Sequence, residues 1–559
     1  HDLAFQLDAI SEPGSGAMGG VAVAAPATPP AVRYRPITQR RGVIYSARFA
    51  PDGQTILYSA GWEGGPAQVS MWRQESPEAI ALPLPEAHLL AVSRSGEMAL
   101  NLAPKWAHNM SWVGTLATAP MFGGAPRQIE NDVMWADFDP RHSTLAAVRD
   151  ASGRGTIESP LGNVLCETDG YFSHLRWSPS GESIACLAHP IARDDRGAVA
   201  IIDRDGRKRM LTDTYTSIQG LAWSPAGDEI WFTAAAPESG HAFRRSLFAV
   251  DLSGEQRLVS GFPGTGRLFD IAPDGRLLMA RDDDRIGMMG KPPGDEEERD
   301  LSWLDWSLPK DLSADGRWLL FEEDRAAADY VVGLRQSNGA PAIKLGEGRA
   351  RAISGDGRWV LTQRPAPGAP LQLLPAGTGR GRSIPVGGIE VGDVKWLPDG
   401  RRVFCTGHDA DGMTRAYILD LESGRFDALG VELRDRALGA AVTADGDRAA
   451  ISLADGRSIL VPLNGGAIVD GPALQTGDMI VAFGADAASL LVHKWGAQSV
   501  EVDRVHLATG TREPWKVLSP RDASGVVLVF QLRVAQDGDA YAYACYRVLS
   551  DLYVAEGLR

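Results

Sequence analysis

The residues of this sequence that could perform catalysis are few and poorly spaced for it. The nearest approach to the Gly-x-Ser-x-Gly turn of serine hydrolases is GESIA at residues 181–185, which lacks the closing glycine. A hydrolase of that kind also needs a doubly wound α/β domain, and no helix-rich stretch is left to form one. We therefore predict that the chain has no catalytic residue and is not an enzyme by itself.

Two acidic segments could be read as metal-binding loops. They are Asp203–Gly206 (DRDG) and His408–Gly412 (HDADG), but neither continues to a glutamate at the distance that a calcium loop requires. The ten histidines are scattered, without the His-Glu-x-x-His or Cys-x-x-Cys spacing of zinc sites. We interpret both segments as hairpin turns and predict no metal and no other cofactor.

The four cysteines are widely separated in the sequence. Cys186, Cys405 and Cys545 lie within the apolar stretches SIACLA, RVFCTG and AYACYR, and Cys166 stands apart from them. Free cysteine behaves as a small hydrophobic residue when it is buried. We interpret the four cysteines as buried small hydrophobic residues, in preference to disulfides or metal ligands.

The charge balance argues against nucleic acid as a partner. The net charge is −15, which opposes a phosphate backbone, and the basic clusters at residues 207–209 and 380–382 lie beside turn glycines instead of forming a stripe. The acidic run at residues 295–300 (DEEERD) follows KPPG, so we expect it to protrude as a solvated loop and to be a possible contact for a basic partner.

No stretch of the sequence is long and apolar enough to span a bilayer. The nearest, residues 18–32, is interrupted by Pro26, Pro29 and Pro30. The opening HDLAFQLDAIS is acidic and lacks the basic region of a signal peptide. We expect a soluble chain without a membrane span.

One short pattern recurs along the chain: alternating residues, a turn such as Pro-Asp-Gly, then an apolar strand. Clear copies are SARFAPDGQTILYSA (46–60), LAWSPAGDEIWFTA (221–234) and VKWLPDGRRVFCTG (394–407). The turn position falls at residues 53, 96, 142, 181, 227, 275, 316, 357, 400, 446, 487 and 538. These twelve copies are spaced by about 44 residues, which is close to the length of one four-stranded propeller blade.

The physical chemistry of the pattern is that of a tight hairpin. Asp-Gly supplies the positive φ angles of the turn, and a preceding proline sets the bend. Large apolar residues shortly before the turn alternate with polar neighbours, so that one face of the strand can pack on the adjacent blade. We therefore interpret Phe49, Trp177, Trp223 and Trp396 as core residues and not as a site.

These observations predict an all-β fold of about twelve four-stranded blades. Twelve blades in one ring would leave a wide hole, so we predict two six-bladed propellers, residues 33–307 and 308–559, with seven plus five blades as the alternative. The last repeat ends on its third strand at SDLYVAEGLR, whereas RYRPITQRRG (33–42) resembles an outer strand with nothing before it. We expect Tyr34–Thr38 to pair with Leu552–Ala555, so that residues 33–40 close the last blade of the second propeller.

The repeats resemble the PD40 repeats of TolB-like propellers. They are less similar to true WD40 repeats, because neither Gly-His nor Trp-Asp recurs. The opening HDLAFQLDAIS, together with RRGVIYSARFAPDGQTILYSAGWEG and YRVLSDLYVAEGLR, resembles bacterial receptor-type serine/threonine protein kinases, of a kind common in acidobacteria, whose C-terminal half is a PD40 propeller. This resemblance implies that residues 1–14 are a short helix from the end of a kinase domain and that residues 15–32 are a Gly/Ala/Pro-rich linker.

The sequence departs from such kinases by lacking their catalytic half. It contains no Gly-rich loop with a following strand lysine, no His-Arg-Asp and no Asp-Phe-Gly, and Ala236–Glu238 (APE) falls in a blade loop. The linker has no membrane span, so the resemblance implies a cytoplasmic propeller, with the periplasm as the alternative if the parent protein has a membrane helix elsewhere.

The leading hypothesis for function is a sensing or interaction module attached to a kinase. Such a module would bind a protein, a peptide or a small ligand at its loops or at a channel mouth, where residues can vary without disturbing the sheets. The alternatives are an accessory propeller of a prolyl-oligopeptidase-like or tricorn-like hydrolase, and a free-standing TolB-like scaffold. The sequence singles out no individual contact residue.

Overall fold

The computed structural model describes residues 32–559, apart from residues 77, 152–153, 236–243, 263, 324–329, 367, 410–412, 434–436 and 497. The helix expected at 1–14, all but the last residue of the expected linker, and Ala236–Glu238 lie outside the described residues. Every regular element of the described residues is a β-strand, which confirms the all-β prediction.

The strands of the first ring lie between residues 33 and 271. They are β1 (Arg33–Pro36), β2 (Gly42–Phe49), β3 (Ile56–Trp62), β4 (Gln68–Trp72), β5 (Ile80–Ala81), β6 (Ala87–Val92), β7 (Glu97–His108), β8 (Ser111–Pro120), β9 (Arg127–Phe138), β10 (Leu145–Ala151), β11 (Arg154–Glu158), β12 (Val164–Thr168), β13 (Tyr171–Trp177), β14 (Ser183–His189), β15 (Ala198–Asp203), β16 (Lys208–Met210), β17 (Ile218–Trp223), β18 (Glu229–Ala234), β19 (Ser246–Asp251), β20 (Gln256–Ser260) and β21 (Thr265–Ile271).

Two long strands, β22 (Leu277–Lys291) and β45 (Tyr541–Glu556), belong to both rings. The second ring further contains β23 (Arg299–Asp300), β24 (Ser307–Leu312), β25 (Trp318–Glu323), β26 (Val331–Gln336), β27 (Ile343–Glu347), β28 (Arg349–Ile353), β29 (Trp359–Gln363), β30 (Leu371–Pro375), β31 (Arg382–Ile384), β32 (Glu390–Trp396), β33 (Arg402–His408), β34 (Thr414–Asp420), β35 (Phe426–Leu433), β36 (Ala437–Val442), β37 (Arg448–Leu453), β38 (Ser458–Pro462), β39 (Val469–Asp470), β40 (Met479–Phe483), β41 (Ser489–His493), β42 (Val500–His506), β43 (Arg512–Leu518) and β44 (Val526–Val534).

Most blades are antiparallel sheets of four strands that are consecutive in the chain. These are β2–β5, β13–β16 and β17–β20 in the first ring, and β24–β27, β28–β31, β32–β35, β36–β39 and β40–β43 in the second. The seven strands β6–β12 make two blades that share β9, because β9 begins as the outer strand beside β8 and ends as the inner strand beside β10.

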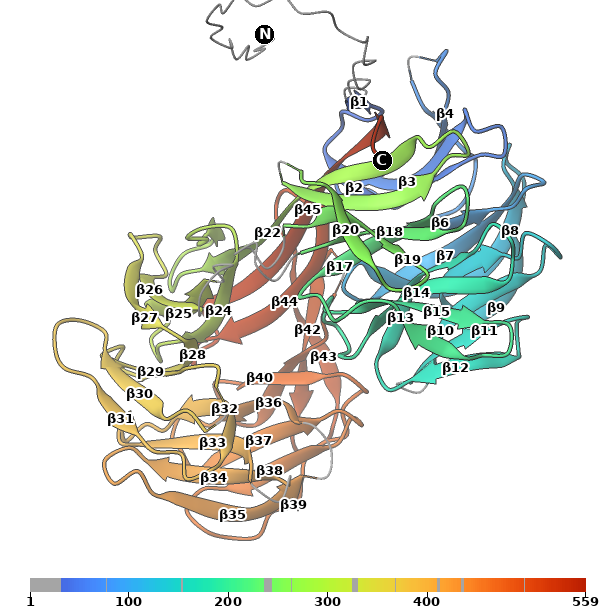
Figure 1. Ribbon diagram of the computed structural model, residues 1–559. Helices are drawn as coiled ribbons and strands as arrows, with labels where there is room; N and C mark the ends of the chain where they lie inside the picture. Colours follow the sequence, from blue (N-terminus) through green and yellow to red (C-terminus); the bar gives the residue numbers. More distant parts are fainter. Residues whose placement is uncertain are drawn as a thin grey trace, which may run out of the picture.

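The sixth blade of each ring is completed by strands that cross between the rings (Figure 1). β22 and β45 pair antiparallel without interruption, from Leu277 opposite Ala555 to Lys291 opposite Tyr541. β21 and β1 flank one half of this ribbon, and β44 and β23 flank the other half. The two rings therefore share one sheet, and the prediction of twelve blades in two six-bladed propellers is confirmed.

The closing role expected for the N-terminal segment is only partly correct. Tyr34 lies opposite Ala555, and the Ile37 N–H donates to the Leu552 carbonyl at 2.7 Å, as expected. However, this half of β45 lies in the sixth blade of the first ring, so the segment does not close the last blade of the second. The reason is the length of β45, which begins in the second ring and continues into the first.

The hairpin turns have the geometry that the repeat predicts. Gly53 has a φ of 64°, and the Asp52 carboxylate accepts hydrogen bonds from the N–H groups of Gln54 and Thr55 at 2.9 and 2.8 Å. The left-handed conformation costs glycine little, and the aspartate satisfies the backbone donors of the turn.

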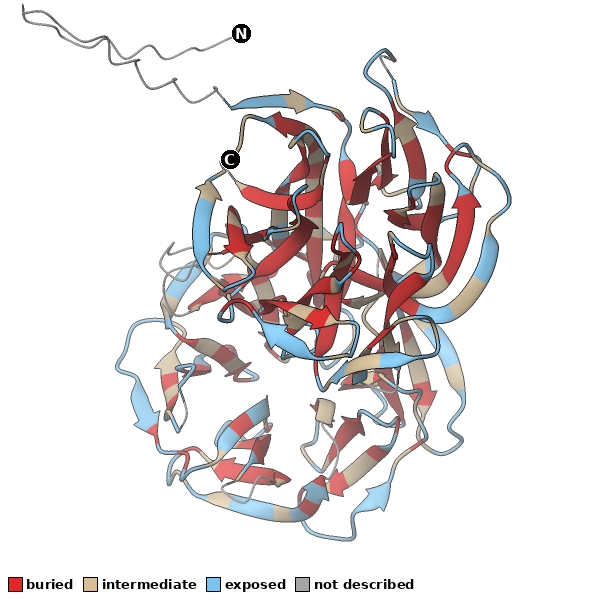
Figure 2. Ribbon diagram, turned by 45° about the vertical axis from the view of Figure 1, so that its right-hand side comes forward, coloured by how far each residue is buried: buried red, intermediate tan, exposed pale blue. Residues whose placement is uncertain are grey.

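Buried residues recur along the strands of both rings (Figure 2), and apolar side chains pack between neighbouring blades. Leu57 of β3, for example, packs with Leu89 of β6 and Leu100 of β7 in the adjacent blade. Phe49, Trp177 and Trp223 are buried as predicted, whereas Trp396 is half-buried. All four cysteines are free thiols, as predicted. Cys186, Cys405 and Cys545 are also buried as predicted, whereas Cys166 is half-buried.

The described residues include no helix that could cross a membrane.

Candidate functional site

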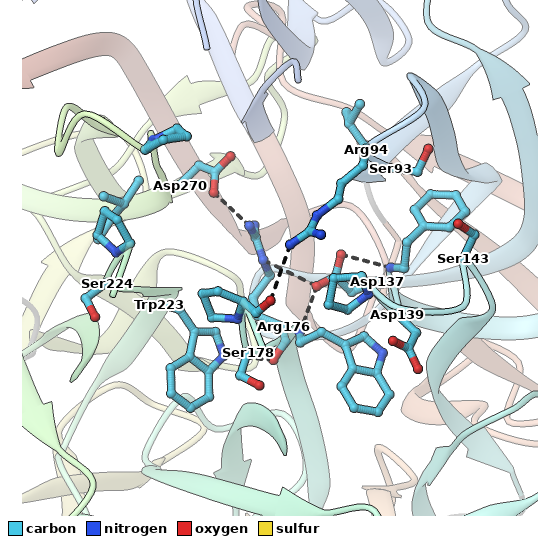
Figure 3. A pocket seen from close by; sticks show the side chains of 18 residues that line it. Ser93, Arg94, Asp137, Asp139, Ser143, Arg176, Ser178, Trp223, Ser224 and Asp270 are labelled. Atoms are coloured by element: carbon cyan, nitrogen blue, oxygen red, sulfur yellow. Dashed lines mark hydrogen bonds and ion pairs between the residues drawn. The ribbon is translucent and has the colours of Figure 1, made fainter. Parts of the chain in front are cut away.

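The hairpin turns of the first ring surround a cavity of about 350 Å³ at one mouth of its central channel (Figure 3). Two positions of the repeat build it. The rim position lies two residues before the turn position, and the floor position lies five residues before it. In the first ring the rim residues are Pro51, Arg94, Pro140, Pro179, Pro225 and Pro273, and the floor residues are Arg48, Ala91, Asp137, Arg176, Ala222 and Asp270.

The floor of this cavity is a cluster of four charges. Arg176 on β13 donates to the Asp270 carboxylate on β21 at 2.7 Å, and its Nε lies 3.6 Å from Asp137 on β9. Arg48 on β2 donates to the Phe269 carbonyl at 3.0 Å and is buried beside the cluster. The two guanidinium groups balance the two carboxylates, so the floor is neutral as a unit.

Each floor carboxylate also ties one blade to another. Asp137 accepts from the Trp177 N–H at 2.8 Å, and Asp270 accepts from the Phe49 N–H at 3.0 Å. Burial raises the pKa of Asp137, and the nearby Arg176 partly offsets that shift. Burial, followed by repulsion from Arg176, lowers the pKa of Arg48 to about 9. These shifts mark the cluster as a desolvated group of charges that the fold holds in place.

The serines around the cavity serve the turns. Ser93, Ser178 and Ser224 each accept a hydrogen bond from a backbone N–H within their own hairpin, at 2.9, 3.2 and 3.1 Å. Ser224 Oγ also donates to the Asp228 carboxylate of its own turn at 2.7 Å. None of the described residues that line the cavity is a histidine.

One serine deeper in the first ring does contact histidines. Ser173 Oγ lies 2.8 Å from His189 Nε2 and 2.8 Å from His174 Nδ1, and His189 Nδ1 lies 3.1 Å from the Arg196 carbonyl oxygen. Ser173 is 2% exposed, and burial lowers the pKa of His189 to about 3. These hydrogen bonds satisfy the polar atoms of the buried serine and histidines. Because Ser173 is buried, a substrate cannot reach its hydroxyl.

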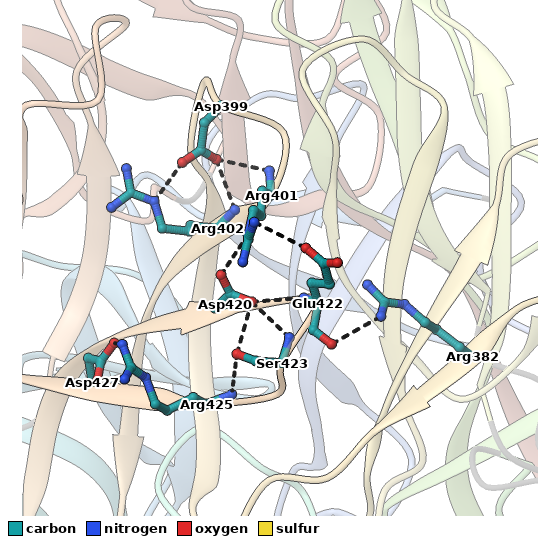
Figure 4. A network of polar contacts seen from close by, with 9 residues as sticks. All are labelled: Arg382, Asp399, Arg401, Arg402, Asp420, Glu422, Ser423, Arg425 and Asp427. Carbon is teal, nitrogen blue, oxygen red and sulfur yellow. Dashed lines mark hydrogen bonds and ion pairs between the residues drawn. The ribbon is translucent and has the colours of Figure 1, made fainter.

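The second ring has a wider cavity at the corresponding mouth, of about 550 Å³. Asp399 at its edge belongs to a network on the outer turns of the third blade (Figure 4). In that network Arg401 donates to Asp420 at 2.7 Å and lies 3.1 Å from Glu422. Hydrogen bonds from Ser423 and Arg401 hold the pKa of Asp420 well below its ordinary value. The network caps exposed turns and encloses no site.

Comparisons with known proteins give distant likenesses. No protein-family model matches the sequence, and no curated protein matches it. A protein assigned as TolB from Agrobacterium tumefaciens aligns with 18% identity over 47% of this chain and 99% of its own, with a TM-score of 0.37. The tricorn protease aligns with 13% identity over 90% of this chain and 56% of its own, with a TM-score of 0.33.

The GH74 xyloglucanase from Xanthomonas campestris aligns with 11% identity over 92% of this chain and 100% of its own, with a TM-score of 0.39. At sequence identities and TM-scores this low, no activity, ligand or partner can be transferred from these proteins to this chain.

The segments considered as motifs in the sequence are turns where they are described. Gly181 of GESIA has a φ of 70° at a hairpin, and Ser183 begins β14. The Asp203 carboxylate accepts from the N–H groups of Asp205 and Arg207 at 3.0 and 2.9 Å, which closes the turn of DRDG. In HDADG, His408 ends β33, and residues 410–412 lie outside the described residues.

The expectation of a protruding acidic loop at residues 295–300 is only partly correct, because residues 295–298 form a loop in which Glu296 and Glu297 are exposed. Arg299 and Asp300 form β23 on the edge of the shared sheet, and Glu298 accepts hydrogen bonds from Tyr541 and Tyr543 at 2.9 and 2.8 Å. The two tyrosines lie far from Glu298 in the sequence, so the acidic run alone could not predict that they contact it.

The charged floor is the part of the site that the sequence analysis missed. The signal was present, because every floor residue lies five positions before a turn position that the repeat defines. Trp177 and Trp223 were predicted as core, and they also line the cavity of the first ring.

Proposed function

We propose that this chain is a non-catalytic binding module that holds a segment of a protein or peptide at the mouth of the first ring. The proposal includes a regulatory role in which occupancy of this mouth is conveyed to an attached serine/threonine protein kinase. The proposed link to a kinase is supported by a sequence feature: HDLAFQLDAIS and the two propeller ends resemble receptor-type kinases.

The observation that carries the binding role is the combination of a fixed floor and a rigid rim. The floor charges neutralise one another, whereas Arg94 on the rim forms no ion pair within the described residues and its Nη2 contacts the Pro179 carbonyl at 3.3 Å. Prolines at five of the six rim positions restrict the backbone around the opening. A preorganised surface of this kind loses little conformational entropy when a partner binds.

The binding role is tested by selecting ligands from a phage library of random dodecapeptides on the intact chain. We expect enriched peptides that lose about tenfold or more in affinity with either of two variants, Arg94→Glu, which reverses the rim charge, and Pro225→Arg, which places a long side chain at the opening. Both positions are exposed, so neither change is expected to disturb folding.

Arg425→Glu is the matched control, because Arg425 is an exposed turn arginine of the second ring. Peptides that bind all three variants as they bind the wild type would place the binding surface elsewhere, and a library without enriched peptides would overturn the peptide-binding role. The kinase link is tested by the sequence encoded upstream of His1: a Gly-rich loop, His-Arg-Asp and Asp-Phe-Gly in order support it, and an unrelated domain overturns it.

A further inference from the structure

The same two repeat positions, rim and floor, surround the mouth of each ring, but the charged residues at the floor positions differ between the rings. In the second ring the rim residues are Ala314, Gly355, Pro398, Ala444, Ala485 and Gln536, and the floor residues are Asp311, Ala352, Lys395, Ala441, Ala482 and Arg533. Five of the six rim residues are proline in the first ring and one is proline in the second. Smaller rim residues accompany the larger cavity, about 550 Å³ against 350 Å³.

The floor charges of the second ring do not balance. The first ring has two cations and two carboxylates at this level, whereas the second has Lys395 and Arg533 with Asp311 as the one carboxylate. Lys395 and Arg533 both act on the Asp311 carboxylate through space, but neither forms an ion pair within 4 Å among the described residues. One positive charge is therefore left over at the base of an open cavity.

The remaining hydrogen bonds of the floor follow the pattern of the first ring. Asp311 accepts from the Ile353 N–H at 3.0 Å, as Asp270 does from the Phe49 N–H. Arg533 donates through Nε to the Lys310 carbonyl at 2.6 Å and through Nη1 to the Leu532 carbonyl at 2.8 Å. These bonds fix the guanidinium but give it no negative charge, since its partners are neutral carbonyl groups.

Two cations deeper in the second ring, Lys310 and Arg349, share one carboxylate. The Glu322 carboxylate, which is fully buried, lies 3.1 Å from Lys310 Nζ and 3.2 Å from Arg349 Nη1. Glu322 is therefore not available to Lys395 or Arg533, neither of which forms an ion pair among the described residues, and Lys395 lines the cavity directly.

One layer of the wall above these charges is apolar, whereas Ser354, Asp356, Asp399 and Gln536 make other parts of the lining polar. The residues one position after the floor are Leu312, Ile353, Trp396, Val442, Phe483 and Val534, and all of them line the cavity. Aliphatic and aromatic walls around one unpaired cation match a ligand with an apolar body and a single negative end. A multiply charged, fully polar anion would leave these walls without a partner.

We propose that the mouth of the second ring binds a carboxylate carried on an apolar body, with Lys395 and Arg533 receiving the carboxylate and the Trp396 side of the cavity receiving the body. This site is separate from the peptide site of the proposed function, so each can fail while the other stands. The carboxylate belongs to a small organic acid, and the C-terminus of an apolar peptide is the second source of the same chemistry.

The test uses matched acids and amides titrated into the intact chain by calorimetry. The probes are 4-phenylbutanoate and 4-phenylbutanamide, then the dipeptide N-acetyl-Leu-Phe with a free and with an amidated C-terminus. We expect each acid that binds to bind about tenfold or more tightly than its amide, because the amide loses the charge-assisted bonds. Binding of phenylbutanoate assigns a small acid, and binding of the dipeptide acid alone assigns a chain end.

Variants locate the site. Lys395→Met and Arg533→Met are expected to weaken binding of the acid about tenfold each, while Lys395→Arg retains it, since Arg keeps the charge. Lys344→Met, which removes an exposed lysine of the outer strand β27, is the matched control and is expected to bind as the wild type. Thermal melting of every variant shows whether a loss of binding is a loss of folding.

Three results would overturn the proposal. They are acids that bind no better than their amides, acid binding that persists in the folded Lys395→Met variant, and the absence of heat from both acids at about 10 mM, where a ligand of millimolar affinity would saturate the site. Tighter binding of inorganic phosphate than of phenylbutanoate would also overturn it, because phosphate has no apolar body to occupy the walls. None of these results bears on Arg94 or on peptide binding at the first ring.

Discussion

Arg176 and Asp270 come from different blades of the first ring, and their side chains meet across the channel mouth at 2.7 Å. The side chains are 17% and 11% exposed, so both charges are largely withdrawn from water. Asp137 approaches the same arginine from a third blade at 3.6 Å. One side chain therefore connects three blades, and the floor of the cavity is also part of what holds the ring together.

Replacing Arg176 with methionine is expected to destabilise the chain by about 3 kcal/mol, because two buried carboxylates then lose their shared cation. Methionine retains the volume of the aliphatic part of the side chain, so the loss reports mainly on removal of the charged guanidinium group. The midpoint of urea unfolding measures it. Arg94→Met is the control, since Arg94 is exposed and forms no ion pair among the described residues, and it is expected to change stability by less than about 0.5 kcal/mol. Equal midpoints for the two variants would contradict the structural role of the cluster.

The number of blades could be predicted from the sequence because each blade repeats its own signal. The Asp-Gly turn and the apolar strand after it are local features, and local features can be counted along the chain. The crossing of β22 and β45 could not be predicted in this way. The repeat marks where β45 begins, at the turn before Tyr541, but nothing local indicates that it continues past Val548 into the other ring.

Fragments cut at the two possible boundaries should differ in stability. Residues 308–559 lack β22 and β23 and leave the last residues of β45 without their partners, whereas residues 285–548 keep every pairing of the second ring from Arg285–Arg547 to Lys291–Tyr541. We expect 285–548 to be a folded monomer and 308–559 to aggregate through its unpaired strand edges. Size-exclusion chromatography and thermal melting measure this. A monomeric 308–559 with an equal or higher melting temperature would show that the shared strands are dispensable.

Gly220 lies at a bulge of the inner strand β17, where the neighbouring strand β21 comes close. Its φ is 75°, and a Cβ at this position would lie 2.3 Å from the Leu268 carbonyl oxygen. Gly220→Ala is therefore expected to cost about 3 kcal/mol, from backbone strain plus the collision. Gly275→Ala has a similar φ of 85° with no atom within 4 Å of the new Cβ, so it should cost about 1 kcal/mol. Similar melting temperatures for the two variants would exclude the close approach.

Asp284, where β22 crosses between the rings, should make stability depend on pH. Burial and the neighbouring Asp282 raise its pKa to about 6, and Arg245, 3.9 Å away, opposes this shift. The folded chain holds this proton more tightly than the unfolded chain. Its contribution to stability is therefore present below about pH 4 and is lost as the pH rises through about 6.

Asp284→Asn should consequently be more stable than the wild type at pH 7, by roughly 1 to 3 kcal/mol, and equal to it below about pH 4. Denaturant unfolding at a series of pH values measures the difference. Asp283→Asn is the matched control, because Asp283 is adjacent but 58% exposed beside Arg285. A stability difference between Asp284→Asn and the wild type that does not vary with pH would contradict the raised pKa.

The candidate sites illustrate a different limit of the sequence. The floor residues can be found by counting five positions back from each turn, yet the count alone does not say that Arg176 and Asp270 meet or that Lys395 and Asp311 do not form a contact pair. That outcome depends on which blades face each other across the ring. The floor charges balance in the first ring and are net positive in the second. This difference can be recognised only once each floor residue is assigned to one of the six blades of its ring.

Asp311 should limit the affinity of the second ring for a carboxylate ligand. It is the one negative charge on that floor, and burial raises its pKa, while Lys395 and Arg533 oppose the shift. Protonation of Asp311 removes a repulsive charge, and burial makes it begin at a higher pH than in an exposed aspartate, so 4-phenylbutanoate should bind more tightly at pH 5.5 than at pH 7. Asp311→Asn should bind a few-fold more tightly than the wild type at pH 7 and lose that pH dependence, since the amide oxygen can still accept from the Ile353 N–H.

Calorimetric titration at both pH values measures this, with Asp315→Asn, an exposed turn residue of the same blade, as the control. Weaker binding by Asp311→Asn would mean that Asp311 itself contributes to the ligand contact instead of opposing it.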